Sequence, residues 1–349
     1  ALESRYRLNP KSHEEWKYLW LGNPLYNQLS RWPIGWVCEN ANGEIVGSVA
    51  NIPLAYEFEG LPLIAATSRA LVMDSAYRSH SFWLLSKFFN QSAVDLFVNT
   101  SVNAKAAKLQ EGFRARRVPV GAWDRSAFWV TNYRAFTTSL MARKGIAGAA
   151  SLSYPLSAGL YVRDRLAGKA LWARHKGTTP RFCDQFDESF DVFWERMRTE
   201  RAQQLLATRS REVLHWHFRY ALASNKAWLL TVSKGDELSA YAILCRQDNA
   251  SYELQRMRLV DFQALPGQME LLRPILSLAL ERCHDEGLHM LEATGFNAEK
   301  QRVIDSTSPH YRELGAWRYF YKAKDQQLAQ RLQDPEVWDP CSFDGDASL

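Results

Sequence analysis

The sequence predicts an α/β protein, with mixed α+β character, that is made of two domains of similar plan. Three observations lead to this fold class. The chain has 349 residues, which is enough for two domains that each bury a core. Its 46% hydrophobic and 23% charged residues are typical of a globular protein. Both halves show the same order of expected elements, namely hairpin, strand, helix, strand, helix and strand.

The first expected helix covers residues 14–20. Trp16, Leu19 and Trp20 form one apolar stripe, and Gly22 and the residues after it stop the helix. Strands at 35–39 and 45–57 then surround an Asn-Gly turn, which is a hairpin signal.

The next strand, 65–73, has the alternation and β-branching of a sheet strand, and Asp74 begins the turn that ends it. A helix follows, in which Phe82, Leu85 and Phe89 recur on one face that is expected to lie on the sheet. A second strand at 94–99 and a short helix at 103–113, stopped by glycine, complete a strand–helix–strand–helix unit.

Two parts of this unit resemble the acyl-CoA N-acyltransferase superfamily, the GNAT fold. Residues 72–82 are similar to the family's strand, Tyr-Arg pair and phosphate-binding turn, and residues 103–113 resemble its Asn, Ala, Leu, Gly-Phe signature. Ser79 and Ser81 stand where the family has glycine, and Gln110 stands where it often has a tyrosine that acts as general acid. A side chain in the turn costs little where φ is negative.

The resemblance implies direct transfer of an acyl group from acetyl-CoA or a longer acyl-CoA, or from an acyl carrier protein, to a small-molecule amine. Main-chain N–H groups would polarise the thioester, and helix-start amides would bind the CoA diphosphate. The residues expected to bind the co-substrate are Val72, Met73, Arg78, Ser79, His80, Ser81, Phe82 and Asn103. For catalysis the candidates are Asp74 as base and Tyr77 as acid, with an ordinary turn-forming role as the alternative for Asp74.

After a basic cluster at 114–117, strands at 128–130 and 133–136 are expected to complete the first sheet. Residues 145–162 carry no charge but are interrupted by glycine and proline, so a spanning helix, which needs roughly 20 apolar residues, is not expected. A linker helix packed between the halves is the leading interpretation. Membrane contact through 145–176, where basic residues follow the apolar stretch, is the alternative.

The second half repeats the plan and is interpreted as a second GNAT-like domain by topology. Its expected elements are helices at 186–198 and 213–222, a hairpin of 227–232 and 240–245, a strand at 252–260, a helix around 271–278, a strand at 288–293, a helix at 298–304 and a closing strand at 317–321. No glycine-rich turn follows Asp261, so this half is expected to shape the acceptor pocket. Each domain is expected to hold a mixed, mostly antiparallel sheet flanked by helices.

The predicted division is an N-terminal domain at 1–141 with the acyl-CoA site, a linker helix region at 142–180, a C-terminal domain at 181–333 and a mobile acidic tail at 334–349. The formal net charge of +5 favours an anionic partner such as CoA, an acyl carrier protein or a nucleic acid. Five cysteines without clip spacing suit a reducing cytoplasm, and the N-terminal residues do not have the pattern of a signal peptide.

No metal cofactor is expected. His215 and His217 lie two residues apart on a helix and face opposite sides. No Gly-x-Ser-x-Gly elbow, Walker loop or dinucleotide fingerprint occurs in the sequence.

Two other functions stay open. Fem-like aminoacyl-tRNA-dependent transferases also pair two GNAT domains, but the sequence offers only the cluster at 114–117 rather than a basic stripe, so a nucleic-acid partner is not favoured. A non-catalytic binding module would account for Ser79, Ser81 and Gln110.

Overall fold

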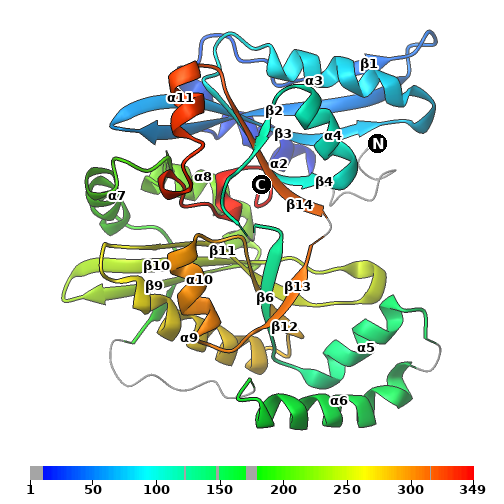
Figure 1. Cartoon of the computed structure of the whole chain (residues 1–349), viewed down its shortest axis with the longest axis vertical. Coiled ribbons are helices and arrows are strands. Elements are labelled where there is room, and N and C mark those ends of the chain that lie inside the picture. The colour runs from blue at the N-terminus through cyan, green and yellow to red at the C-terminus, as the bar shows by residue number, and fades with distance from the viewer. Residues whose placement is uncertain (1–10, 122, 147–148, 170–178, 315) are drawn as a thin grey trace. The chain divides into compact units, whose positions relative to one another are not determined.

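The computed structural model describes residues 11–121, 123–146, 149–169, 179–314 and 316–349 (Figure 1). The chain divides into two compact units, and neither is one continuous stretch. The first unit contains 1–120, 194–220 and 315–349, and the second contains 121–193 and 221–314. Each unit is built on one seven-stranded sheet.

The sheet of the first unit is mixed but mostly antiparallel. Its strands run in the order β1 (Gly35–Glu39), β2 (Ile45–Phe58), β3 (Leu61–Met73), β4 (Leu96–Asn103), β14 (Ala316–Ala323) and β5 (Arg116–Arg117), with β8 (Leu206–Ala207) paired to β2. Among the described strands of this sheet, β3 and β4 are the parallel pair, and the other pairs are antiparallel.

Helices flank this sheet. They are α2 (His13–Leu21), α3 (Ser81–Phe89), α4 (Ala104–Gly112), α11 (Gln326–Arg331) and the larger part of α8 (Arg211–Ala223), with 3₁₀ turns η1 (Tyr26–Gln28), η2 (Ser75–His80), η5 (Pro335–Val337) and η6 (Ser342–Asp344). A capping box of Ser12 and Glu15 starts α2, as its predicted position requires. The sequence therefore predicts α2, α3, α4 and α8 but not α11.

The face of α3 that packs on the sheet differs from the predicted one. Leu84, Leu85, Phe88 and Phe89 are buried, whereas Phe82 is 55% exposed. The ring of Phe82 stacks instead on Phe113 at the end of α4, with 4.6 Å between centroids. The prediction of a core position for Phe82 is therefore wrong, and the residue lies in the first turn of α3, which begins at Ser81.

The sheet of the second unit is also mixed. Its order is β13 (His310–Glu313), β6 (Arg125–Val130), β12 (Met290–Thr294), β11 (Arg256–Ala264), β10 (Glu237–Arg246), β9 (Ala227–Lys234) and β7 (Arg181–Cys183). Here β11 and β12 are the parallel pair of the described strands. The helical elements are α5 (Tyr133–Arg143), α6 (Ala149–Leu166), α9 (Leu272–Asp285), α10 (Ala298–Asp305), η3 (Ala250–Tyr252) and η4 (Met269–Leu271); α7 (Ser189–Glu200) contributes residues to both units.

A buried carboxylate joins four strands of this second sheet. Glu292 on β12 accepts from Arg258 on β11 at 2.7 Å and also from Arg312 on β13, and Arg256 lies 3.2 Å away. Ser126 on β6 donates to the same carboxylate at 2.6 Å. Burial alone raises the pKa of Glu292, but the three guanidinium groups outweigh burial and lower it. The group is therefore an ionised structural centre.

Three predicted assignments of strands are wrong. The strand expected at 128–130 is β6, but it pairs with β12 and β13 in the second sheet. Residues 133–136 begin the helix α5, where Asn132 caps the N–H of Ala135. The closing strand expected at 317–321 is β14, which lies between β4 and β5 in the first sheet. Local pattern does not specify which strand will be the neighbour of β6 or β14, so the contiguous boundaries at 141 and 333 differ from the observed units.

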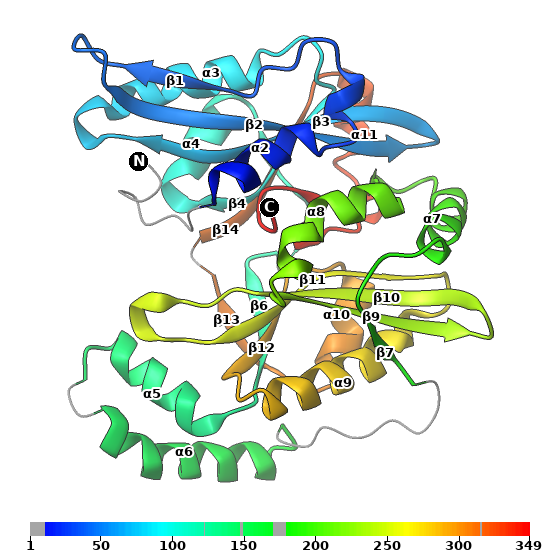
Figure 2. The ribbon, with the colours of Figure 1, turned by 180° about the vertical axis from the view of Figure 1, so that it is seen from behind.

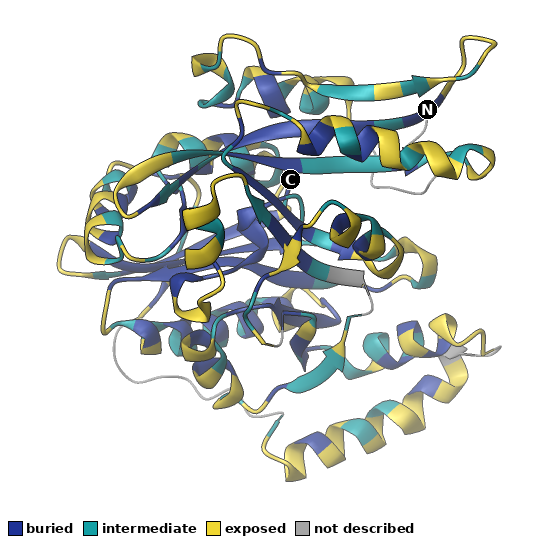
Figure 3. Cartoon of the chain, turned by 45° about the horizontal axis from the view of Figure 1, so that its top comes forward, coloured by how far each residue is buried: buried dark blue, intermediate teal, exposed yellow. Residues whose placement is uncertain are grey.

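The segments expected to be a linker and a mobile tail are parts of the units. Helix α6 lies antiparallel to α5 within the second unit (Figure 2). In the tail, Val337, Trp338, Cys341, Phe343 and Leu349 are buried. Burial is concentrated on the two sheets, and α6 is mostly exposed (Figure 3). Among the described helices, none combines the length and the apolar character that crossing a membrane requires.

Candidate functional site

The two parallel strands of the first sheet separate along their length. β3 and β4 pair only at Ala65 with Leu96 and at Ala66 with Phe97, although β3 continues to Met73 and β4 to Asn103. Among the described strands, none pairs with β3 on this side beyond Ala66. The unpaired edges, 67–73 of β3 and 98–103 of β4, are here called the β3–β4 gap. Such edges present backbone N–H and C=O groups to a ligand.

The side chain of Asn99 interrupts the ladder. Its Oδ1 accepts from the backbone N–H of Ser68 at 2.9 Å and from the Ser68 hydroxyl at 2.6 Å. The amide group thus takes the place of the next strand-to-strand hydrogen bond. Asn99 is buried, so this separation of the strands is built into the core.

A β-bulge lies in β3 on its other edge, where β3 pairs with β2. Ser48 on β2 faces Val72 and Ala50 faces Arg69, so two residues of β3, including Ala70, oppose one residue of β2. Ala70 has a φ of 52°, which is uncommon for a residue with a side chain. Bulges twist and bend a strand, and they often lie next to functional sites.

The last residues of the described chain lie along β4 in this region. Asp346 accepts from the backbone N–H of Thr100 at 2.7 Å and from the Ser101 hydroxyl. Arg69 on β3 donates to the carbonyl oxygen of Leu349. The segment 346–349 therefore bonds to both strands of the gap. Asp346 and Arg69 were missed by the sequence analysis, although Trp338, Cys341 and Phe343 among the acidic residues were a signal that this tail packs.

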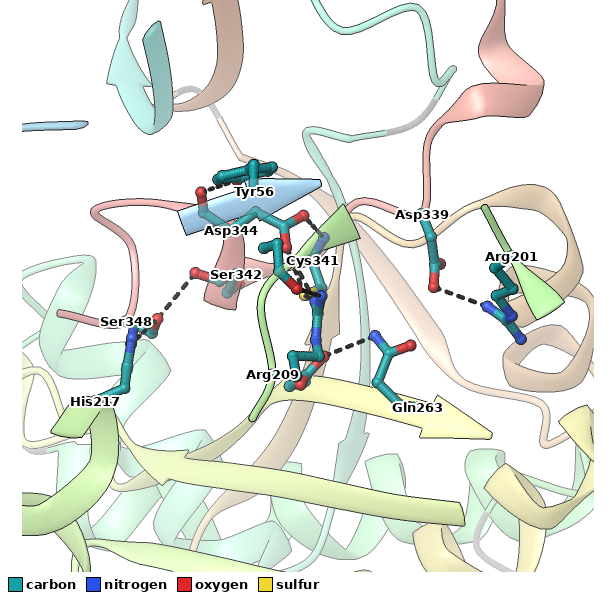
Figure 4. A network of polar contacts seen from close by, with 12 residues as sticks. Tyr56, Arg201, Arg209, His217, Gln263, Asp339, Cys341, Ser342, Asp344 and Ser348 are labelled. Carbon is teal, nitrogen blue, oxygen red and sulfur yellow. Dashed lines mark hydrogen bonds and ion pairs between the residues drawn. The ribbon is translucent and has the colours of Figure 1, made fainter. Parts of the chain in front are cut away.

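The tail is held by a polar network within the first unit (Figure 4). Arg209 donates to Asp344 Oδ1 at 3.0 Å and to Cys341 Sγ at 3.1 Å, and Tyr56 donates to the carbonyl oxygen of Asp344. His217 Nε2 lies 2.7 Å from Ser348 Oγ. Burial and the Asp344 charge raise the pKa of Tyr56, so its hydroxyl stays protonated.

The turn after β3 differs in detail from the prediction. From the sequence we expect the helix to begin near Ser79; the 3₁₀ turn η2 begins four residues earlier, at Ser75, and the helix α3 begins at Ser81. The backbone of Tyr77, with φ of −112° and ψ of 16°, is not helical, so η2 consists of two short turns joined at a kink. The N–H of Tyr77 donates to the carbonyl oxygen of Asp74, and the N–H of Ser81 donates to that of Arg78. The amides at Ser75 and Ala76 are those that the start of η2 leaves open.

No side chain makes a capping hydrogen bond at the start of η2. Ser79 and Ser81 both have negative φ, and the serines that replace the expected glycines therefore cause no backbone strain. Ser81 Oγ donates to the carbonyl oxygen of Arg78 at 2.5 Å. The departure from the glycine pattern is thus compatible with the turn.

The structure places the predicted site residues at one edge of the sheet. Val72 and Met73 pair with Ser48 and Gly47 of β2. Asp74 and Tyr77 are half-buried just past the end of β3, and the N–H of Tyr77 donates to the carbonyl oxygen of Asp74 at 2.9 Å. The side chains of Arg78, Ser79, His80 and Phe82 are exposed. Roles for these residues in binding or catalysis stay predictions.

Asn103 and Gln110 belong to α4, which follows β4. Asn103 Oδ1 caps the helix by accepting from the N–H groups of Lys105 and Ala106 at 3.0 and 2.9 Å. Only its amide nitrogen is left for a ligand. Gln110 is 2% exposed, and its Oε1 has no hydrogen-bond partner among the described residues. Because β3 and β4 are parallel, the start of α4 and the turn η2 lie at the same edge of the sheet.

Within the described residues, no three His, Cys, Asp or Glu side chains gather as a metal ion would require. His217 contacts Ser348, and His215 lies on the exposed side of α8.

Comparisons with known proteins place the fold. No protein-family model and no curated protein sequence matches this chain. A structure of N-myristoyltransferase from Saccharomyces cerevisiae with bound myristoyl-CoA superposes with a TM-score of 0.55 at 13% identity, over 90% of this chain and 71% of that one. A GCN5-related N-acetyltransferase from Anabaena variabilis gives a TM-score of 0.50 at 11% identity, over 93% and 69%.

This chain has a tandem GNAT fold. The prediction of two mixed, mostly antiparallel sheets flanked by helices is confirmed. At these identities the likeness shows the GNAT fold alone.

Proposed function

We propose that the protein transfers an acyl group from an acyl-CoA to an amine, with the thioester held in the β3–β4 gap. The observation that carries this proposal is the end of the ladder after Ala66 and Phe97 in a GNAT fold. Support also comes from the yeast N-myristoyltransferase structure, since that protein has a similar fold and holds myristoyl-CoA.

The reaction needs positioning more than reactive side chains. Backbone N–H groups of β3 beyond Arg69 would polarise the thioester carbonyl, and the open amides at the start of η2 would meet the diphosphate. The amine nitrogen attacks the carbonyl carbon, a C–N bond forms, the C–S bond breaks and the CoA thiolate leaves. The proton of the amine goes to a carboxylate, for which Asp74 is the candidate, or to water.

The side chain of Arg78 tests this placement, since it is exposed on η2 and not involved in the core. In Arg78→Glu a negative charge would face the diphosphate, and we expect CoA to bind at least roughly tenfold more weakly by calorimetry. Lys87→Glu is the matched control, because it makes the same charge change at the far end of α3. Equal loss in both variants, or no loss in either, would remove η2 from the site.

Turnover is measured by release of CoA thiol from acetyl-CoA and longer acyl-CoAs with panels of amino sugars and amino acids. Tight CoA binding without thiol release on any amine would support a binding module instead. The buried, unpartnered Gln110 oxygen is the observation that favours that alternative.

The Fem-like alternative has one supporting observation. Arg114, Arg116 and Arg117 are exposed at the edge strand β5. Binding of aminoacyl-tRNA with an affinity that falls steeply as salt rises would favour it. If the donor is an acyl carrier protein, its acyl form would release thiol in a saturable way at concentrations where acyl-CoA releases none.

A further inference from the structure

The second unit contains a cavity of about 360 Å³, separate from the β3–β4 gap. It lies between the sheet and the hairpin of α5 and α6, and its walls come from β6, β12, β13, η3 and both helices. This volume is within the range of small-molecule pockets. Neither the acyl transfer reaction nor the predicted site residues account for it.

The deep part of the cavity is apolar. Val130, Leu254 and Met290 line it and are each less than 5% exposed. Phe128, Phe136 and Leu160 add apolar surface. An apolar cavity of this size leaves its lining without contacts unless an apolar group fills it.

The outer part is cationic. Arg143 and Arg163 line the cavity, and both are exposed. Arg143 has no carboxylate partner among the described residues; its guanidinium lies 5.9 Å from the Tyr252 ring. Arg163 pairs at 3.2 Å with Asp164, but it is 66% exposed, and such surface pairs are weak.

The hairpin as a whole carries an excess of positive charge. Between positions 133 and 169 the sequence has the cations Arg134, Arg143, Lys144, Arg163, Arg165 and Lys169, and its one acid is Asp164. The Asp164 carboxylate is buried and already accepts from Tyr133 at 3.2 Å and faces His310 Nε2 at 2.7 Å. An anion at the mouth of the cavity would therefore meet cations and no free carboxylate of this hairpin.

The wall beside the mouth is fixed before any ligand arrives. His310 is bonded to Asp164 and stacks on Phe128, with 5.2 Å between ring centroids. Lys169 donates through its backbone N–H to the Asp164 carbonyl oxygen at 2.8 Å. Through Asp164, which bonds to Tyr133 and His310, the helices α5 and α6 and the strand β13 are joined, so the pocket does not have to be ordered at the cost of binding energy.

We propose that this pocket binds a single-chain anionic amphiphile of the fatty-acid class. The hydrocarbon chain lies against Val130, Leu254 and Met290, and the carboxylate lies at Arg143 and Arg163. The polarity of the cavity, apolar inside and cationic at its mouth, matches that of the ligand along one axis. This site is in the second unit and does not depend on the proposed transferase activity.

The test is calorimetric binding of laurate to the full chain, with dodecanol as the uncharged probe of the same chain length. We expect laurate to bind more tightly than dodecanol. The double substitution Arg143→Ala with Arg163→Ala should weaken laurate at least roughly tenfold and leave dodecanol nearly unchanged, since a charge-assisted pair contributes on the order of one tenfold step or more. Arg165→Ala is the matched control, because this exposed arginine of α6 does not line the cavity.

A second variant blocks the pocket itself. Leu160→Trp adds bulk at the α6 wall and should reduce binding of both probes while CoA binding by the other unit stays the same. Near-ultraviolet circular dichroism checks that Leu160→Trp folds. If Leu160→Trp does not fold, the double arginine variant still tests the proposal, because both arginines are on the surface. Absence of laurate binding, equal affinity for both probes, or an arginine pair that binds like the control would each overturn the proposal. Binding to phosphatidylserine vesicles without laurate that is lost in the double arginine variant would also overturn the proposal. It would show that Arg143 and Arg163 contact a membrane surface.

Discussion

His289 shows how a single buried side chain links this protein to pH. The residue is 8% exposed, and its Nδ1 accepts from the backbone N–H of Gln255 at 3.3 Å and lies 3.1 Å from Ser139 Oγ. Protonation of Nδ1 would place two N–H groups face to face. Burial lowers the pKa of His289, and burial likewise lowers that of His310 despite its bond to Asp164.

Stability should therefore fall as the solution becomes mildly acidic. The unfolded chain takes up the proton at the ordinary histidine pKa of about 6.5, whereas the folded state resists it. The stabilising contribution is complete above that value and is lost as the pH falls through it towards the lowered pKa. Melting temperatures between pH 8 and 5.5 measure this. His289→Asn should flatten the profile, and the exposed His13→Asn should not; an equal slope in wild type and His289→Asn would contradict the assignment.

At the scale of residues, the sequence predicts local chemistry but not long-range partners. Asp74, Tyr77 and Asn103 lie at the strand ends where the pattern put them. Asp346 could not be predicted as a partner of Thr100, since 246 positions separate the two residues and no local pattern joins them. The sequence shows that Gln110 departs from the family signature, but its burial needed the structure.

Among the elements, β3 and β4 owe their separation to the Asn99 amide. Asn99→Ala would leave the backbone N–H of Ser68 without its acceptor in a partly buried place, at a cost of about 1–3 kcal/mol in the free energy of unfolding. The control Ser68→Ala removes only the hydroxyl bond and should cost about 0.5–1.5 kcal/mol. Urea denaturation gives both values. If Asn99→Ala were no more harmful than Ser68→Ala, the amide would not hold the gap.

The helix α5 illustrates why an element type can be misjudged. Residues 133–136 contain two aromatic rings, which favour a strand, yet Asn132 supplies a helix cap and the side chains that follow bond within the helix. Asn132 was a helix-cap signal in the sequence, but the aromatic residues were given more weight in the prediction of a strand. Similarly, the spacing of Phe82, Leu85 and Phe89 predicted a shared face, but the first of them lies in the opening turn.

For the whole molecule, the sequence predicts two units with the same order of elements. It does not predict that the first unit includes 315–349 from the end of the described chain, or that the second unit begins at 121. The repeated order of strands and helices carries the plan. Which sheet a strand joins depends on which sheet still has an unpaired edge when the strand arrives. The apolar patterns of β6 and β14 would fit either sheet. At identities of 11–13%, the sequences of the similar structures do not show which strand belongs to which unit of this chain.

A contiguous fragment should consequently fail to fold as a domain. Residues 1–141 lack β14, whose Tyr319, Phe320 and Tyr321 are buried in the first unit. We expect this fragment to show no cooperative thermal transition by circular dichroism, and a version of 1–120 joined by a flexible linker to 316–349 to recover part of it. Cooperative melting of 1–141 by itself would show that β14 is dispensable.

The position of β14 also sets an order of events during synthesis. Until residue 323 has left the ribosome, β4 has no neighbour on its outer side, and the nascent first sheet carries an open edge while more than 200 further residues are translated. Completion of the first sheet thus waits for a strand that is made long after β4, and the unfinished edge is where a ribosome-associated chaperone would have most to protect.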